Sequence, residues 1–332
     1  MHTVIAQALS SVTLGTPVSH ENLTMIPLLG PPSVEQEPSY LTLDQALGLG
    51  WTEVTEISDQ GSVPELRVIN KGGTPVFVLD GEELVGAKQN RVVNLSILVP
   101  ATTALTIPVS CVEAGRWRAR SRAFTAAPRT QYARGRAKRM AQVTASLRMS
   151  GSRQSDQADV WADIAAKSDR LGTHSPTAAM EEIFVTHAEF TDAAVAALRP
   201  VERQAGALFL IDGRVVGFDL FDRAATLRRL LPKLVRSVAI DALESARTPS
   251  VGTGSVGTGS VGADFSRPVT ARIPESALGL AAHFLAVVCQ AKTHEAPAVG
   301  LGRDVRLDNA AISGAALLAE EGAIHVSAFS LN

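Results

Sequence analysis

The chain has 332 residues, of which 45% are hydrophobic and 19% are charged, and its formal net charge is −2. This composition is typical of a globular protein with an ample core and argues against a disordered or fibrous chain. No run of about 18 apolar residues is present, and no basic-then-apolar start precedes a cleavage site, so we expect a cytoplasmic protein without a membrane span or signal peptide. The two cysteines, Cys111 and Cys289, are too few for a disulfide scaffold and fit a reducing compartment.

The first part of the chain predicts a β-rich region. A strand is expected at residues 22–29, a short helix at 43–49 with Thr42 as its N-cap, and a strand at 51–57. Four further strand candidates follow, at residues 65–70, 75–79, 91–99 and 105–113. The short turns between them favour an antiparallel sheet. Asp80-Gly81 is a hairpin signal, but poor strand formers follow it, so a loop or bulged corner fits equally well.

Helical periodicity dominates the middle of the chain. The pattern predicts helices at residues 132–149, 156–171 with Ser155 as N-cap, 175–187, 192–203 and 224–246. Strand character returns at 207–220, where an apolar run followed by an Asp-Gly turn resembles the sequence of residues 76–86. Two ordinary hairpins explain this likeness better than a duplicated β unit, although duplication stays open.

The last part of the chain begins with a repeat of Ser-Val-Gly-Thr-Gly within residues 250–262. Such a composition predicts a disordered linker, here at 249–263, and the strands that recur after it favour a loop inserted in one fold. A helix at 274–290 and strands at 304–307, 311–318 and 323–329 complete the expected elements.

These elements together predict an α+β protein in which antiparallel sheets from the N- and C-terminal parts pack with central helices. We expect a single domain over residues 18–332. Its predicted parts are a β-rich part at 18–118, a mainly helical part at 126–247 with the hairpin at 207–220, and a helix with closing strands at 264–332.

Charge is segregated along the chain. Residues 1–113 carry 12 acidic and 4 basic side chains, whereas residues 114–155 carry 11 basic side chains and no acidic one. Such a block is usually solvated or meets an anionic partner. Few aromatic residues interleave with it, which favours a solvated face, or docking onto the acidic part of this protein, over nucleic-acid binding. An interaction module that docks protein or nucleic acid through residues 116–153 is the alternative function.

The densest polar cluster lies at residues 82–91. It contains Glu82, Glu83, Lys88, Gln89, Asn90 and Arg91. Adjacent carboxylates on a regular strand point to opposite faces, but on a loop they could act together. The two bases could hold a phosphate, and the two amides could contact a base or sugar edge. A polar loop whose ions pair with one another is the other interpretation.

The strand at 105–113 ends in Glu113, and Arg116 follows it. These two residues join the cluster if the strands pair, or they form an ion pair of their own. Cys111 is favoured as a core residue, since a nucleophilic cysteine needs a nearby base or helix start. His325 alternates with apolar neighbours and is favoured as a hydrogen-bonded structural histidine, and no histidine spacing predicts a metal site.

Four segments, residues 80–91, 108–117, 300–306 and 325–329, together resemble a bacterial family associated with ADP-ribosylglycohydrolase and with the rhodanese-phosphatase superfamily. The resemblance covers residues 18–329 and implies, by association, ADP-ribose or related nucleotide chemistry. It carries over no catalytic residue and no cofactor. We therefore expect an uncharacterised bacterial protein that binds or processes a small phosphorylated ligand. The catalytic candidates are Glu82, Glu83 and Glu113, and the ligand-binding candidates are Lys88, Gln89, Asn90, Arg91 and Arg116.

Overall fold

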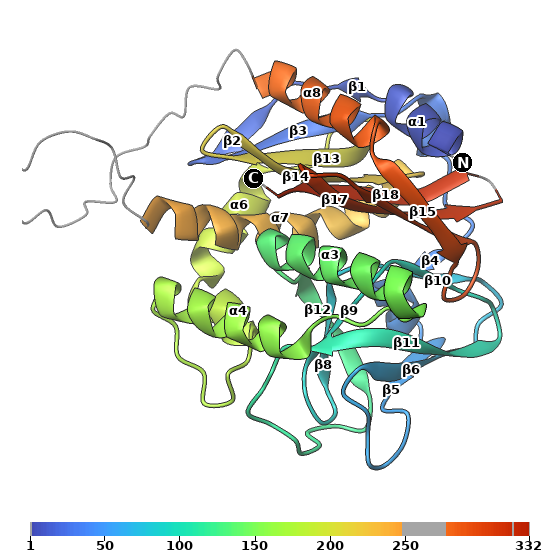
Figure 1. Ribbon diagram of the computed structural model, residues 1–332, viewed down its shortest axis with the longest axis vertical. Coiled ribbons are helices and arrows are strands. Elements are labelled where there is room, and N and C mark those ends of the chain that lie inside the picture. Colours follow the sequence, from blue (N-terminus) through green and yellow to red (C-terminus); the bar gives the residue numbers. More distant parts are fainter. Residues whose placement is uncertain (1, 248–276, 321, 332) are drawn as a thin grey trace, which may run out of the picture.

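A nine-stranded antiparallel sheet runs through the molecule in a computed structural model, which describes residues 2–247, 277–320 and 322–331 (Figure 1). In spatial order its strands are β1 (Thr13–Leu14), β3 (Leu23–Leu29), β13 (Gln204–Ile211), β14 (Arg214–Phe221), β18 (Gly322–Ser330), β17 (Ile312–Ala319), β16 (Arg303–Asp308) and β15 (Lys292–Pro297), with β2 (Val18–His20) also paired to β3. Because β14 pairs with β18, segments from both sides of residues 249–263 share this sheet. The predicted linker itself lies outside the described residues.

Helices cover both faces of this sheet (Figure 1). One face is covered by α1 (His2–Ser10) and α8 (Ala277–Cys289), and the other by α3 (Ala133–Ser150) and α7 (Ala224–Arg247). The inward positions of α7 recur every three or four residues, as in Leu227, Leu230, Leu231 and Leu234, which gives the helix one apolar side. Burial of this stripe against the sheet holds the helix in place.

Two smaller sheets lie beyond α3 and α7, so these helices are sandwiched between β layers (Figure 1). The six-stranded sheet has the order β12 (Phe124–Thr130), β8 (Glu82–Gly86), β9 (Arg91–Val93), β11 (Thr103–Cys111), β6 (Glu65–Asn70) and β5 (Thr52–Thr55). The three-stranded sheet has the order β10 (Ile97–Val99), β7 (Val76–Val78) and β4 (Leu41–Thr42). The α+β class and the antiparallel sheets are thus confirmed, whereas the single domain stays a prediction.

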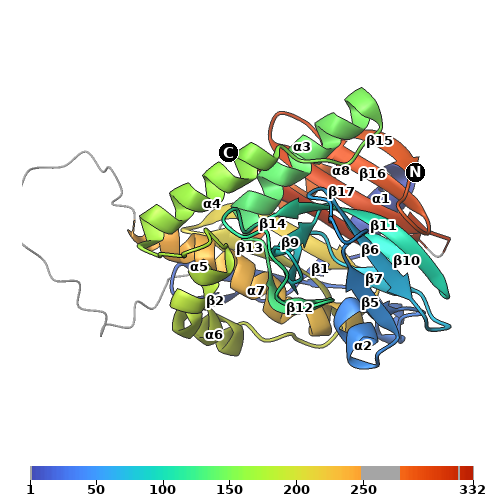
Figure 2. The same cartoon turned by 90° about the horizontal axis from the view of Figure 1, so that it is seen from below.

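The remaining helices border these sheets. They are η1 (Pro32–Glu35), α2 (Leu43–Gly48), α4 (Gln157–Leu171), α5 (Glu181–Thr186) and α6 (Ala188–Ala197). Seen from below, α4 continues the flank that α3 begins, and α5 and α6 lie at the far end from α2 (Figure 2). Within the described ranges, none of the helices combines the length and apolarity that crossing a membrane requires.

The structure corrects several predicted elements. The predicted strand at 91–99 is two strands, β9 and β10, which belong to different sheets because the chain turns at residues 94–96. The helix predicted at 175–187 begins only at Glu181, and the one predicted at 192–203 lies at Ala188–Ala197, ahead of Pro200. The N-cap of α4 is Asp156 rather than Ser155, since the Asp156 side chain accepts the Asp159 N–H at 3.1 Å.

Some elements were not predicted as strands or helices, among them α1, β8, β12 and β15. The β12 strand has few β-branched residues, contains Pro128 and carries a register shift between Ala126 and Thr130. It lies at the edge of the six-stranded sheet, where a proline is tolerated. The local sequence of β12 therefore disfavours a strand, but pairing with the neighbouring strand forms one nevertheless.

Candidate functional site

Glu82 and Glu83 lie on strand β8, and their side chains point to opposite faces of the sheet. The Glu82 carboxylate accepts a hydrogen bond from Lys233 of α7 at 2.5 Å, and Glu83 accepts one from Arg129 of β12 at 2.5 Å. Burial raises the pKa of both carboxyls, although each cation opposes that rise. The two carboxylates are therefore separated, and each has its own cation.

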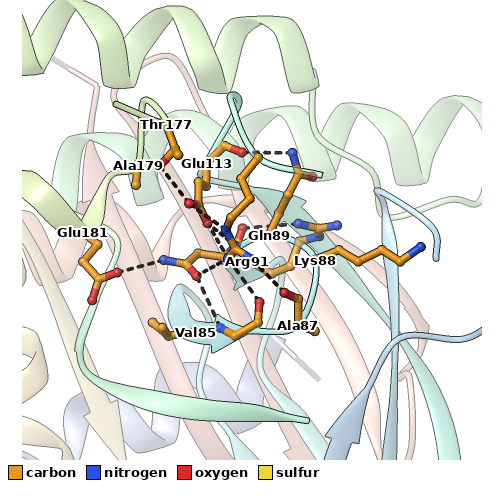
Figure 3. A network of polar contacts seen from close by, with 12 residues as sticks. Val85, Ala87, Lys88, Gln89, Arg91, Glu113, Thr177, Ala179 and Glu181 are labelled. Atoms are coloured by element: carbon orange, nitrogen blue, oxygen red, sulfur yellow. Dashed lines mark hydrogen bonds and ion pairs between the residues drawn. The ribbon is translucent and has the colours of Figure 1, made fainter. Parts of the chain in front are cut away.

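Arg116 joins the end of β11 to the loop after β8, and Figure 3 labels Glu113 and Ala87, its partners in these two segments. The Arg116 Nε and Nη2 donate to the two carboxylate oxygens of Glu113 at 2.8 and 2.6 Å. Nη1 donates to the Ala87 carbonyl at 2.6 Å, and Nη2 also reaches Asn90 Oδ1 at 3.2 Å. The structure thus brings the two sequence segments together, and Glu113 and Arg116 also form a bidentate ion pair with almost no solvent exposure, so both alternatives left open by the sequence occur at once.

The neighbouring amides belong to the same network. Gln89 Nε2 donates to the Glu113 carbonyl at 2.9 Å, and Asn90 Nδ2 donates to Glu181 Oε2 at 3.1 Å. Thr177 Oγ1 donates to Glu113 Oε1 at 2.8 Å. Burial raises the pKa of Glu113, but the hydrogen bonds from Arg116, Thr177 and the Asn90 N–H outweigh it and leave that pKa below its ordinary value.

Thr177 and Glu181 were missed by the sequence analysis. They lie 64 residues from Glu113 and 91 residues from Asn90, respectively. No local pattern links residues so far apart. The isolated bridge between Glu113 and Ala179 brings the 175–181 segment beside the cluster.

Arg91 differs from its neighbours because its buried guanidinium lacks a carboxylate partner among the described residues. The side chain has no exposed surface, and its Nε and Nη2 have no hydrogen-bond partner within the same part of the chain. Nη1 lies 3.4 Å from the carbonyl of Asn90, which is a weak contact. Burial lowers the pKa of Arg91, although the Cys111 and Glu56 side chains oppose that shift.

Other arginines with almost no exposed surface have carboxylate partners. The shortest nitrogen–oxygen distances are 2.6 Å for Arg116 to Glu113, 2.8 Å for Arg136 to Asp219, 2.9 Å for Arg139 to Asp80 and 2.8 Å for Arg306 to Asp304. An uncompensated buried charge costs several kcal/mol, on the order of 3–5 kcal/mol when a buried pair is broken. The surroundings of Arg91 therefore suit an anion other than a side chain of the described residues.

Trp117 and Lys88 lie next to Arg91. The Trp117 ring centroid is 5.8 Å from the Arg91 guanidinium carbon and 5.3 Å from Lys88 Nζ. The Trp117 side chain is 48% exposed, so the ring lies between Arg91 and solvent. Lys88 points away from the Arg116 network (Figure 3), and its Nζ donates to the carbonyls of Asp59 and Gln60.

Cys111 is opposite Arg91 in the pairing of β11 with β9. Its thiol is buried and donates to Gln89 Oε1 at 3.2 Å. Burial raises the pKa of this thiol, and the Arg91 charge only partly offsets the rise. A thiol in this state is a weak nucleophile at neutral pH.

The basic segment 116–153 pairs largely with acids of the same chain. Arg129, Arg136 and Arg139 are buried against acids of the N-terminal part. Further pairs with Asp or Glu include Arg116 to Glu113, Arg134 to Glu244, Lys138 to Asp159, Arg148 to Asp308 and Arg153 to Asp304. Arg118, Arg120 and Arg122 are exposed. Docking of protein or nucleic acid through this segment stays a prediction, with few exposed bases left to support it.

The fold and the cluster define an α+β protein with a buried polar network beside an arginine that has no carboxylate partner among the described residues. Residues 11–329 match a family, and the chain belongs to it: the ARG and Rhodanese-Phosphatase-superfamily-associated Protein domain family. The family's description links it to those superfamilies and names no ligand or reaction. No curated protein and no solved structure matches the chain.

Proposed function

We propose that this protein binds a small phosphorylated ligand of the nucleotide or ADP-ribose type at Arg91. The observation that carries the proposal is the buried guanidinium with two donors, Nε and Nη2, that have no partner among the described residues. A phosphate group presents oxygens at the spacing of such a fork and supplies the missing negative charge. Binding would therefore remove the cost of an unpaired buried ion.

Lys88 and Trp117 extend this site towards solvent. Lys88 adds a second cation beside the same indole ring, which suits a ligand with more than one phosphate oxygen to neutralise. The half-exposed ring of Trp117 offers a face on which a base or ribose can stack. The ring also covers Arg91, so we expect its side chain to move outward when the ligand enters.

Gln89, Asn90 and Arg116 support the site in this proposal. Their polar groups already have protein partners, so they hold the loop that precedes Arg91 rather than offering free donors. Glu113 binds Arg116 and accepts the Asn90 N–H, so its carboxylate belongs to this supporting network. Its lowered pKa keeps it ionised at neutral pH, which suits a positioning role better than proton donation.

Isothermal titration calorimetry with ADP-ribose, AMP and adenosine tests the proposal. We expect ADP-ribose and AMP to bind the wild type and adenosine to bind at least tenfold more weakly, because it lacks the phosphate. Arg91→Met should abolish binding of the phosphorylated ligands. The matched control is Arg118→Met, which removes an exposed arginine of the neighbouring loop and should leave binding unchanged. Equal binding by wild type and Arg91→Met, or no binding by the wild type, would overturn the proposal.

A further inference from the structure

A second polar arrangement connects the turn before β10 to the nine-stranded sheet. Ser96, in the turn before β10, lies with its Oγ 2.8 Å from Nδ1 of His325 on β18. His325 Nε2 lies 3.0 Å from Oδ1 of Asp219 on β14. A hydroxyl, an imidazole and a carboxylate are thus connected in series by hydrogen bonds, although they come from three separate strands or turns.

The hydrogen-bond partners fix the direction of this series. The Asp80 N–H donates to Ser96 Oγ at 3.0 Å, so the serine's own hydrogen is free to point at His325 Nδ1. The Asp219 carboxylate accepts two hydrogen bonds from Arg136, at 3.0 and 2.8 Å. It also accepts the hydrogen of His325 Nε2. The lone pair on Nδ1 therefore faces the serine hydroxyl, which is the arrangement that a general base requires.

The His325 ring is held in this orientation by aromatic side chains. It stacks on Phe221 with ring centroids 4.7 Å apart, and it meets Phe77 edge-on at 5.9 Å. His325 itself is only 2% exposed, whereas Ser96 is half-buried. The base is thus fixed and shielded from water, while the residue that carries the hydroxyl is partly exposed.

A small cavity lies next to Ser96, and Arg306 lines it. Its lining includes Ser96, Arg306, His325 and Ser327, and its volume is about 10 Å³, which suits a group about the size of one water molecule. Arg306 has no exposed surface, and its Nη1 has no partner within the described part of the chain, although its other nitrogens pair with Asp304. A donor of this kind can stabilise negative charge that develops on a reacting oxygen.

We infer that Ser96, His325 and Asp219 form a nucleophilic site that hydrolyses esters of small acyl groups, with Arg306 at the developing oxyanion. This site is separate from the ligand site at Arg91 and does not depend on it. The cavity holds one group about the size of a water molecule, such as the methyl group of an acetyl ester, which restricts the acyl part to acetyl.

The reaction balances with water as the only co-reactant. Ser96 Oγ attacks the ester carbonyl carbon while its proton moves to His325 Nδ1, and the carbonyl electron pair moves to the oxygen near Arg306. Collapse breaks the bond to the alcohol oxygen, which takes the proton from His325. Water then attacks the acyl carbon, gives a proton to Nδ1, and releases the acid as Ser96 regains its hydrogen. Asp219 keeps the imidazole in the required tautomer throughout.

Covalent labelling with methanesulfonyl fluoride and hydrolysis of p-nitrophenyl acetate test this inference. We expect intact-mass and peptide analysis to place one methanesulfonyl group on Ser96 of the wild type. Ser96→Ala should lose both labelling and hydrolysis, and His325→Gln should lower hydrolysis roughly 10²-fold or more. Ser150→Ala is the matched control, since it removes the hydroxyl of an exposed serine at the end of α3 that does not line the cavity. Equal labelling and hydrolysis by wild type and Ser96→Ala would overturn the inference.

Ser96→Cys supplies a second test that does not require turnover. A thiol next to the His325 base should react with iodoacetamide at pH 7 at least tenfold faster than Cys289, a half-buried free cysteine of the same chain. Circular dichroism melting of each variant checks that it is folded. If the thiol introduced by Ser96→Cys reacts no faster than Cys289 in the folded variant, His325 does not activate position 96 and the inference is overturned.

Discussion

Arg91 and Arg136 are both almost completely buried, yet their surroundings differ in kind. Arg136 donates hydrogen bonds to Asp219 and Asp80 and lies 4.8 Å from the Phe329 ring centroid. Arg91 has no carboxylate partner among the described residues and lies beneath a half-exposed indole ring. Burial alone therefore does not distinguish a structural ion from a binding group. The presence or absence of a partner does, because the desolvation cost of a buried charge without one is uncompensated until a ligand supplies the counter-charge.

The largest loss of stability is expected when Arg136, the structural ion, is replaced. Replacing Arg136 by Met leaves Asp219 and Asp80 buried with less compensation, so the free energy of unfolding should fall by about 3–5 kcal/mol. Chemical denaturation followed by circular dichroism measures this loss. Arg134→Met is a suitable control, because Arg134 is exposed on the same helix, and it should stay close to the wild type. A small change in Arg136→Met would contradict the structural role.

An intermediate effect is expected at Glu113, which connects the two parts of the candidate site. Its pKa is lowered from the ordinary value of 4.5 in the folded protein, so its ionised form stabilises the fold above about pH 4.5. This stabilisation is lost as the pH falls through the lowered pKa. Glu113→Gln leaves Arg116 without its counter-charge and should cost about 1–3 kcal/mol at pH 7.

The pH dependence separates this effect from simple loss of packing. Denaturation curves of wild type and Glu113→Gln should differ most at pH 7 and converge as the pH falls below 4.5. A difference that stays constant between pH 7 and pH 3 would mean that the charge of Glu113 does not contribute. Gln89→Leu, which alters a neutral member of the same network, should show no such convergence.

Sequence patterns predicted the fold class because periodicity records which face of an element is buried. The strand at 65–70 and the long helix after residue 224 are examples, since each has a clear period and clear ends.

The two Asp-Gly turns have similar local sequences but different structural roles, which local sequence alone does not predict. Asp212-Gly213 closes a hairpin between paired strands, with φ angles of 50° and 74°. Asp80-Gly81 instead leads from one sheet into another.

Gly81 has a local reason and a distant one for being glycine. Its φ of 79° favours glycine in any context. In addition, a Cβ at this position would lie 2.9 Å from Cγ and Cδ of Arg136, a contact that only the tertiary structure creates.

The candidate site likewise depends on contacts that the sequence does not reveal. The polar cluster at 82–91 was visible in the sequence, whereas its partners Thr177 and Glu181 were not. The series of Ser96, Asp219 and His325 spans 229 residues between Ser96 and His325, so it also has no local signature.

The smallest expected change tests the central claim most directly. If Arg91 is an unpaired ion until a ligand binds, Arg91→Met in the ligand-free protein should unfold with a free energy equal to that of the wild type, or up to about 2 kcal/mol higher. Denaturant titration of the two proteins side by side at pH 7 provides this comparison. A loss of about 3–5 kcal/mol in Arg91→Met, as expected for Arg136→Met, would show that Arg91 already has a stabilising partner and would contradict its role as the anion-binding group.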